Sequence, residues 1–219
     1  MSNEILQKIT ATFEQELKDI DFNAKTYADV NEFALAVGET LAGAFEKHIV
    51  VDPKDIIEEI LNDRLLENHR LITNQGVLVQ GLLNKKADIG LAVQVPEFNK
   101  SRLEGLLSRL LTEDFKDSKW LLNAPIVNFS QSIVDDMIRK NAEFHHNVGL
   151  GAKVTRKEGG NCCKWCKNLV GVYAYPDVPK DVYRRHSNCR CTVEYVPKKG
   201  VRQDVHTKKF DYTLSDLKG

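Results

Sequence analysis

Apolar residues along the first 150 positions recur every three or four residues, which is the spacing of a helix that buries one face. The pattern predicts a first helix around residues 5–17 and a second from about Thr26 to Phe45. Asp52 and Pro53 predict the start of a third helix, because Asp is a favoured N-cap and Pro suits the first helical position. The apolar positions that define these three helices are Ile5, Ile9, Phe13, Leu17, Val30, Phe33, Ala34, Val37, Leu41, Phe45, Ile56, Ile57, Ile60, Leu61, Leu65 and Leu66.

Two further helices are predicted before Gly149, after a segment at 73–94 in which the apolar period is lost. Ser101 and Glu104 have the spacing of a capping box, and five leucines at helical intervals follow them, which we expect to face the core. Pro125 predicts the start of a long helix, and Gly149 predicts its end.

The composition changes after residue 150. The runs at 153–156 and 192–196 favour strands, and Gly159-Gly160 favours a turn between less regular segments. Residues 151–219 hold 15 Lys and Arg against 7 Asp and Glu, whereas residues 1–150 hold 16 against 24. The net charge of zero therefore conceals an acidic N-terminal part and a basic C-terminal part.

All five cysteines of the chain lie between Asn161 and Val196. Cys163 and Cys166 form a C-x-x-C, and His186, Cys189 and Cys191 follow within six residues of one another. Two such half-sites, one of them followed by a strand, are typical of a structural zinc site, in which thiolates and imidazoles bind the ion at about 2.0–2.3 Å. The sequence therefore predicts one structural Zn²⁺ bound by ligands drawn from these five residues.

Three other uses of the cysteines are less favoured than structural zinc. Disulfides are disfavoured because five is an odd number and the first residues lack the basic and apolar regions of a secretion signal, so we expect a reducing cytosol. A thioredoxin-like redox site would need a βαβ setting that the pattern does not show. Catalytic zinc would need an open position and a nearby base, and the deaminase signature is missing because Cys163 follows Cys162 rather than a proline.

The choice of the fourth ligand stays open between Cys189 and Cys191. In an extended strand their side chains would share a face but lie well apart, so both could serve one ion only if a loop or bulge occurs at Arg190. We expect Cys162 to be a small buried apolar residue or a spectator to the site.

These observations predict a mainly α protein with a small zinc-stabilised α+β module at its C-terminal side. The expected parts are a helical body at 1–150, the Cys/His module at 151–197 and a basic extended tail at 198–219. About 45 residues bury little core of their own, so the metal would contribute folding free energy directly. The apolar content of 42% suits a globular chain, and no apolar run approaches the roughly 18 residues of a membrane span.

Basic residues surround the predicted metal site and are candidates for contacts with nucleic-acid phosphates. Without a series of stacking aromatics, such binding would be independent of base sequence, and an ordinary solvated surface or a face against acidic protein segments is an equal interpretation. The candidate nucleic-acid-binding residues are Lys164, Lys167, Arg184, Arg185, Arg190, Lys198 and Lys199.

The C-terminal motif resembles that of a phage protein family. Cys163 and Cys166, the short segment at 169–171 and the run RHSNCRCT at 185–192 are together similar to the signature of tailed-phage minor head proteins of the Mu F-like head morphogenesis family. Segment 126–136 and Gly149-Leu150 resemble related proteins from phages and prophages of Gram-positive bacteria. The family often has Pro where this chain has Ser187, a difference that loosens the turn but removes no ligand.

The resemblance implies a non-enzymatic structural protein. It would be a minor head protein in the capsid interior of the virion, found in the host cytoplasm before assembly, which contacts the portal or major capsid protein and packaged DNA without sequence preference. It would act in head morphogenesis, genome packaging or DNA delivery, with no membrane and no small-molecule substrate as partner. Two other hypotheses are a cytosolic zinc-containing nucleic-acid-binding protein and a zinc-dependent nuclease or hydrolase that uses His186 with His145 or His146. Adjacent helical residues point about 100° apart, so we assign His145 and His146 a structural role.

Overall fold

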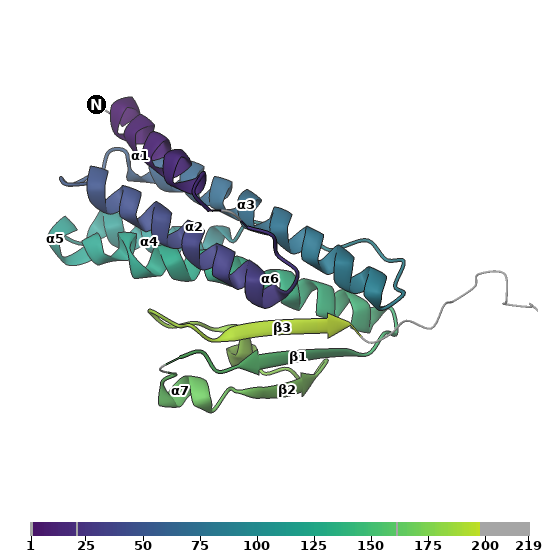
Figure 1. Cartoon of the computed structure of the whole chain (residues 1–219). Coiled ribbons are helices and arrows are strands. Elements are labelled where there is room, and N and C mark those ends of the chain that lie inside the picture. Colours follow the sequence, from purple (N-terminus) through teal and green to yellow (C-terminus); the bar gives the residue numbers. More distant parts are fainter. Residues whose placement is uncertain (1, 21, 161, 198–219) are drawn as a thin grey trace, which may run out of the picture.

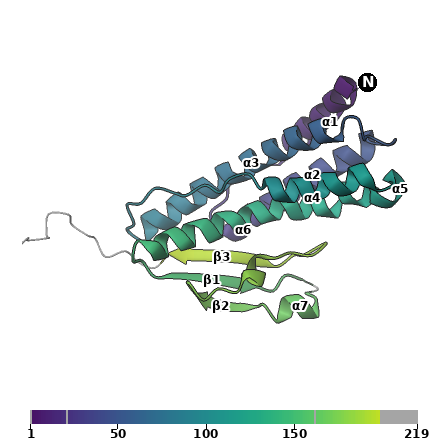
Figure 2. The same ribbon diagram turned by 180° about the vertical axis from the view of Figure 1, so that it is seen from behind.

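A computed structural model describes residues 2–20, 22–160 and 162–197 of the chain. Long helices form a bundle, and a small antiparallel sheet packs along one side of it, next to α6 (Figures 1 and 2). The helices are α1 (Ser2–Leu17), α2 (Tyr27–His48), α3 (Ile57–Lys86), α4 (Lys100–Thr112), α5 (Phe115–Ser118), α6 (Ala124–Asn147) and α7 (Lys164–Lys167), with 3-10 turns η1 (Lys119–Leu122) and η2 (Lys180–Tyr183). The strands are β1 (Ala152–Lys157), β2 (Gly171–Ala174) and β3 (Thr192–Pro197).

The mainly α prediction is confirmed, and several helix ends follow from local chemistry. Thr26 and Asp29 form a reciprocal capping box at the start of α2. Pro125 occupies the first turn of α6, and Gly149 follows the end of that helix with φ +84°, a left-handed conformation that glycine adopts without strain.

Two predicted helix starts are wrong. The leucine-rich helix α4 is capped by Asn99, whose side chain accepts a hydrogen bond from Arg102 N, rather than by a box at Ser101. Helix α3 begins at Ile57, because the residues after Pro53 form a turn in which Asp52 Oδ1 accepts from Lys54 N. Asn is as good a cap as Ser, so the sequence alone does not separate neighbouring candidates.

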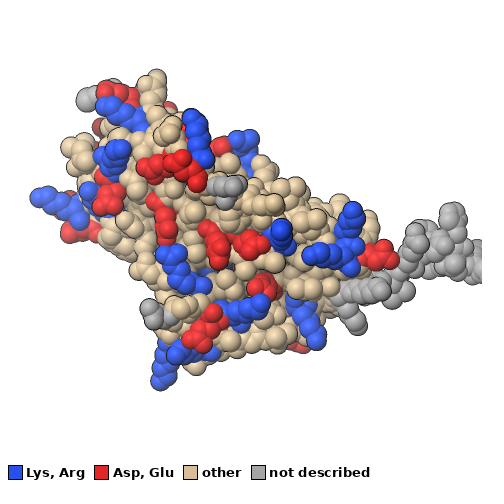
Figure 3. Space-filling model, viewed as in Figure 1, with Lys and Arg blue, Asp and Glu red and all other residues tan. Residues whose placement is uncertain are grey.

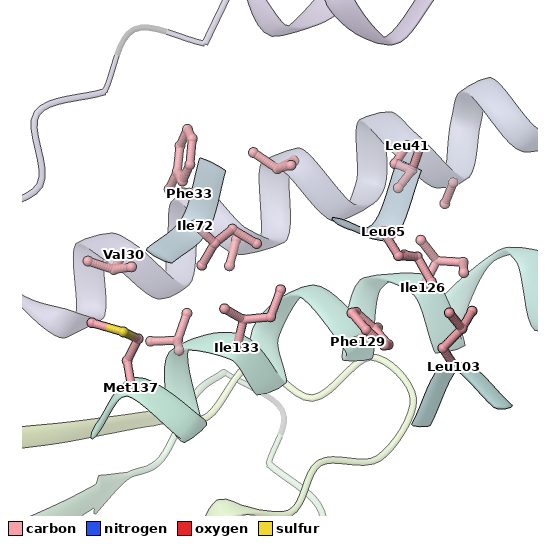
Figure 4. Close-up of a cluster of buried hydrophobic side chains, with 14 of the residues drawn as sticks. Val30, Phe33, Leu41, Leu65, Ile72, Leu103, Ile126, Phe129, Ile133 and Met137 are labelled. Carbon is pink, nitrogen blue, oxygen red and sulfur yellow. The ribbon is translucent and has the colours of Figure 1, made fainter. Parts of the chain in front are cut away.

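The core lies where α2, α3, α4 and α6 meet, and Figure 4 shows apolar side chains from all four helices pointing toward one another. Helices α2 and α6 approach closely at Gly38, where an added Cβ would lie 2.7 Å from Ser130 Oγ and 3.0 Å from Val127 Cα. A glycine is therefore required there for the two backbones to pack. The labelled core residues are Val30, Phe33, Leu41, Leu65, Ile72, Leu103, Ile126, Phe129, Ile133 and Met137.

The sheet has the strand order β2-β1-β3, and both pairings are antiparallel. Val154 in the central strand is paired with Tyr173 on one side and Tyr195 on the other. Ala152, Val154, Val193 and Tyr195 are buried in the same apolar cluster as the helices. The strands at 153–156 and 192–196 are thus confirmed, and their inner face extends the core of the helical body.

The predicted basic tail at 198–219 lies outside the described residues. Among the described residues, none of the helices has the length and apolar character of a membrane span.

Candidate metal centre

The cysteines reach one place from two loops at the same end of the sheet. Cys163 is the N-cap of α7, and its Sγ accepts from Cys166 N at 3.4 Å, which turns both side chains of the C-x-x-C to one side. Cys189 and Cys191 precede β3 and lie outside the regular strand. The loop at Arg190 that would let both residues reach the centre is therefore present.

Three predicted ligands form the first group. Cys163 Sγ lies 3.3 Å and Cys166 Sγ 3.1 Å from His186 Nε2, and the three ligand atoms all lie within 4.8 Å of one another. Cys189 Sγ is 3.8 Å from Cys166 Sγ. The structure thus brings together the C-x-x-C, His186 and the first cysteine of the C-x-C.

A second group includes a residue that the sequence analysis set aside. Cys162 Sγ lies 3.4 Å from Cys191 Sγ, and these two sulfurs with that of Cys166 also lie within 4.8 Å of one another. The structure therefore places Cys162, which was predicted to be a small buried apolar residue or a spectator, beside the candidate ligands. Its position next to Cys163 was the available signal, because the turn that brings one thiol to the centre carries its neighbour to the adjacent side.

The donor set suits a zinc ion. Zn–S bonds of about 2.3 Å in a tetrahedron give S···S edges of about 3.8 Å, which is the separation of Cys166 and Cys189. His186 Nδ1 lies 2.8 Å from the carbonyl oxygen of Ser187. A carbonyl only accepts, so this contact suits a proton on Nδ1, which leaves Nε2, on the side of the cysteines, as the nitrogen that would bind a metal.

Hydrogen bonds and burial set the acidity of the thiols in opposite directions. The backbone N–H of Cys166 lowers the pKa of Cys163. Burial raises the pKa of Cys162 to about 11, and burial also raises the pKa of Cys166. Burial works against ionisation of Cys191 too, but a bond from the backbone N–H of Gly159 leaves its pKa lowered. A cation at the centre would oppose the desolvation penalty on all of these thiolates.

Arg156 supplies a positive charge behind the cysteines. Its side chain is buried, and its Nη2 lies 3.5 Å from Cys166 Sγ and 3.7 Å from Cys189 Sγ. Its Nη1 donates to the carbonyl oxygens of Val182 and Arg184. Arg156 was not predicted as a site residue. It shares the inward face of β1 with Ala152 and Val154, and a position on such a face is expected to hold an apolar side chain.

Helix α6 holds the loop that carries Cys189 and Cys191. Gln131 Nε2 donates to the Cys189 carbonyl oxygen at 3.1 Å. Arg185 Nη1 donates to the Cys191 carbonyl oxygen at 2.6 Å, while its other nitrogens bind the carboxylate of Asp135. The ligands are therefore positioned by the body of the protein as well as by the sheet.

The candidate nucleic-acid residues do not behave alike. The prediction that Arg185 binds nucleic acid is wrong. Its side chain is only 2% exposed and is bound to Asp135, so it cannot reach a phosphate. Lys164, Lys167, Arg184 and Arg190 are exposed. Lys198 and Lys199 lie outside the described residues.

Carboxylates accompany most of the exposed basic residues at this end of the molecule. Lys167, Arg184 and Arg190 form ion pairs with Glu158, Asp181 and Glu39 at 3.9, 3.0 and 2.8 Å. Figure 3 likewise shows Lys and Arg interspersed with Asp and Glu on the face in view. The surface is therefore of mixed charge.

His145 lies apart from the cysteines. It is buried between α6 and β3, with Nδ1 2.5 Å from the hydroxyl of Tyr195. Neither His145 nor His146 belongs to a group of potential metal ligands among the described residues. His145 thus has the structural position that was predicted for it.

No protein-family model, curated protein sequence or solved structure matches this chain.

Proposed function

We propose that this chain is a non-enzymatic minor head protein of a tailed phage, in which structural zinc orders the ligand loops of the C-terminal module. The observation that carries the proposal is the grouping of Cys163, Cys166 and His186 at the end of a small sheet, with Cys189 Sγ 3.8 Å from Cys166 Sγ as the candidate fourth ligand. The motif that supplies these ligands is the one that resembles the phage family.

The arrangement favours a structural rather than a catalytic ion. One Zn²⁺ bound by these four side chains has no open position for a substrate or an activated water. Three thiolates, a neutral imidazole and Zn²⁺ leave one negative charge, which the buried guanidinium of Arg156 offsets. The cysteines Cys166, Cys189 and Cys191 form a small cluster of their own, so the metal takes the place that an apolar core would otherwise fill.

The proposed role in head assembly comes from the resemblance, and an incorporation experiment tests it. The chain is co-expressed with the portal, scaffold and major capsid proteins of the phage or prophage that encodes it, and heads are purified by sedimentation. We expect a few copies per head by quantitative mass spectrometry, and far fewer for Cys166→Ser. Lys8→Ala, a substitution at an exposed position of α1, is the control and should be incorporated normally. Heads that contain none of the protein would contradict the proposed role.

A second candidate function is sequence-independent nucleic-acid binding by a cytosolic zinc protein. It is favoured by the exposed side chains of Lys164, Lys167, Arg184 and Arg190 around the centre. The carboxylates paired with three of them reduce the number of phosphates that they would neutralise, so we expect weak binding. DNA binding by the purified protein that weakens steeply with salt, without head incorporation, would favour this function over the first. Metal-dependent cleavage of the same DNA would instead favour a nuclease.

A further inference from the structure

We propose that the centre binds two thiophilic divalent ions rather than one, with Cys166 and Cys189 as thiolates shared between them. The proposal rests on the zinc centre proposed above and deepens it. The first ion has Cys163 and His186 as its own ligands, and the second ion has Cys162 and Cys191.

The number of donors supports the second ion. A tetrahedral ion uses four ligands, whereas five donors form two groups that share Cys166, and a sixth, Cys189 Sγ, lies 3.8 Å from Cys166 Sγ. Two tetrahedra that share one edge need four terminal and two bridging donors, which is six in total. The six side chains are Cys162, Cys163, Cys166, His186, Cys189 and Cys191.

The distances place each donor in one of these roles. Cys163 Sγ and Cys166 Sγ lie 3.3 and 3.1 Å from His186 Nε2, which defines the first side of the centre. On the other side, Cys162 Sγ and Cys191 Sγ lie 3.4 Å apart and group with Cys166. Cys166 is the donor common to both groups.

Cys189 completes the shared edge. Its Sγ is 3.8 Å from that of Cys166, which is the edge length of a tetrahedron with Zn–S bonds of about 2.3 Å. Both sulfurs are buried, and both face the Nη2 of Arg156 at 3.5 and 3.7 Å. The guanidinium thus points at the two sulfurs assigned as bridges.

The charges also balance. Five thiolates and two divalent ions carry a net charge of −1, and a His186 imidazole that binds an ion through Nε2 would add no charge. The single positive charge of Arg156 offsets it. Without a second ion, Cys162 and Cys191 would be a pair of thiols held in contact beside an occupied site.

The test counts ions in the full-length chain. The protein is purified under reducing conditions, loaded with Zn²⁺ and, in parallel, with ¹¹³Cd²⁺, and analysed by native mass spectrometry and ¹¹³Cd NMR. We expect two ions per chain and two resonances, of which one has the shift of an all-sulfur site and the other a shift moved by a nitrogen ligand. We expect Cys162→Ser to lose the all-sulfur resonance, while Cys163→Ser perturbs the other one more strongly.

The wild-type count does not depend on the folding of any variant. One ion, one resonance and no effect of Cys162→Ser would overturn the two-ion centre and leave the single zinc site standing. No bound ion at all would overturn the zinc centre as well, so the two failures are distinguishable.

Discussion

Arg185 and Asp135 form a bidentate ion pair that joins the loop before β3, which carries Cys189 and Cys191, to the middle of α6. Arg185 Nε and Nη2 donate to the two carboxylate oxygens at 2.5 and 2.8 Å, and both side chains are 2% exposed. The same guanidinium donates to the carbonyl oxygen of Cys191. One residue therefore connects a helix of the body to the backbone that carries a candidate ligand.

Arg185→Ala should destabilise the protein strongly. It leaves the carboxylate of Asp135 buried without a partner, and breaking a buried pair in this way typically costs about 3–5 kcal/mol. The free energy of unfolding is measured by urea titration with zinc present. Arg184→Ala is the control, because its pair with Asp181 is exposed and should contribute little. Equal stabilities of the two variants would show that the Arg185–Asp135 pair does not anchor the loop.

Gly38→Ala and Gly43→Ala in α2 should change stability in opposite directions. A Cβ at Gly38 would press on Ser130 Oγ and the Val127 backbone, and overpacking of this kind costs about 1–3 kcal/mol. A Cβ at Gly43 would meet no atom within 4 Å, and alanine there should stabilise the helix by up to about 1 kcal/mol. The melting temperatures of the two variants test the close approach of α2 and α6. A lower melting temperature for Gly43→Ala than for Gly38→Ala would contradict it.

Gly159→Ala should weaken metal binding, whereas Gly160→Ala should not. A Cβ at Gly159 would overlap the carbonyl oxygen of Arg190, between the two cysteines of the C-x-C, so the loop would have to move. No atom lies within 4 Å of a Cβ at Gly160. Competition with a chromophoric chelator gives both zinc affinities, and we expect at least a tenfold loss for the first variant only. Equal affinities would mean that the loop accommodates the methyl group.

The local part of the fold was predictable from sequence, and the long-range part was not. Helix periodicity and the signals at Thr26, Pro125 and Gly149 are local properties, and they identified α2 and α6 correctly. The unbroken helix through residues 73–86 was missed because Gly76 disturbs the pattern. The structure explains that glycine, since a Cβ there would lie 2.9 Å from Met137 Cε.

In the candidate site, too, the local features were predictable and the long-range contacts were not. The spacing of the cysteines identified the centre, because metal ligands cluster along the chain in knuckles. Arg185 was assigned to the surface because nothing near it in the sequence indicates Asp135, which lies 50 positions away. The edge strand β2 is only four residues long, with too little alternation to be recognised.

Acidification should destabilise the protein through His145. Burial lowers the pKa of His145 below its ordinary value of 6.5, so the unfolded chain takes up a proton that the folded chain excludes. The stabilisation is complete above about pH 6.5 and is lost as the pH falls through the window below it, with a limiting slope of about 1.4 kcal/mol per pH unit.

His145→Gln should reduce this slope when urea unfolding is measured between pH 7.5 and 5.5. Tyr195→Phe is the control: it removes the hydrogen-bond partner but leaves the buried imidazole, so stability should fall throughout and the slope should remain. An unchanged slope in His145→Gln would assign the acid sensitivity to other groups.

Removal of the metal should release the ligand loops without dissolving the sheet. The inner face of β1 and β3 belongs to the apolar core of the helical body, whereas Cys166, Cys189 and Cys191 form a separate small cluster. Hydrogen exchange before and after chelation tests this difference. We expect the amides of residues 162–168 and 186–191 to lose protection, because the ion replaces a core there. Val154 and Tyr195, which are paired in the sheet, should remain protected. Loss of protection across the strands as well would mean that the metal, and not the shared core, holds the sheet on α6.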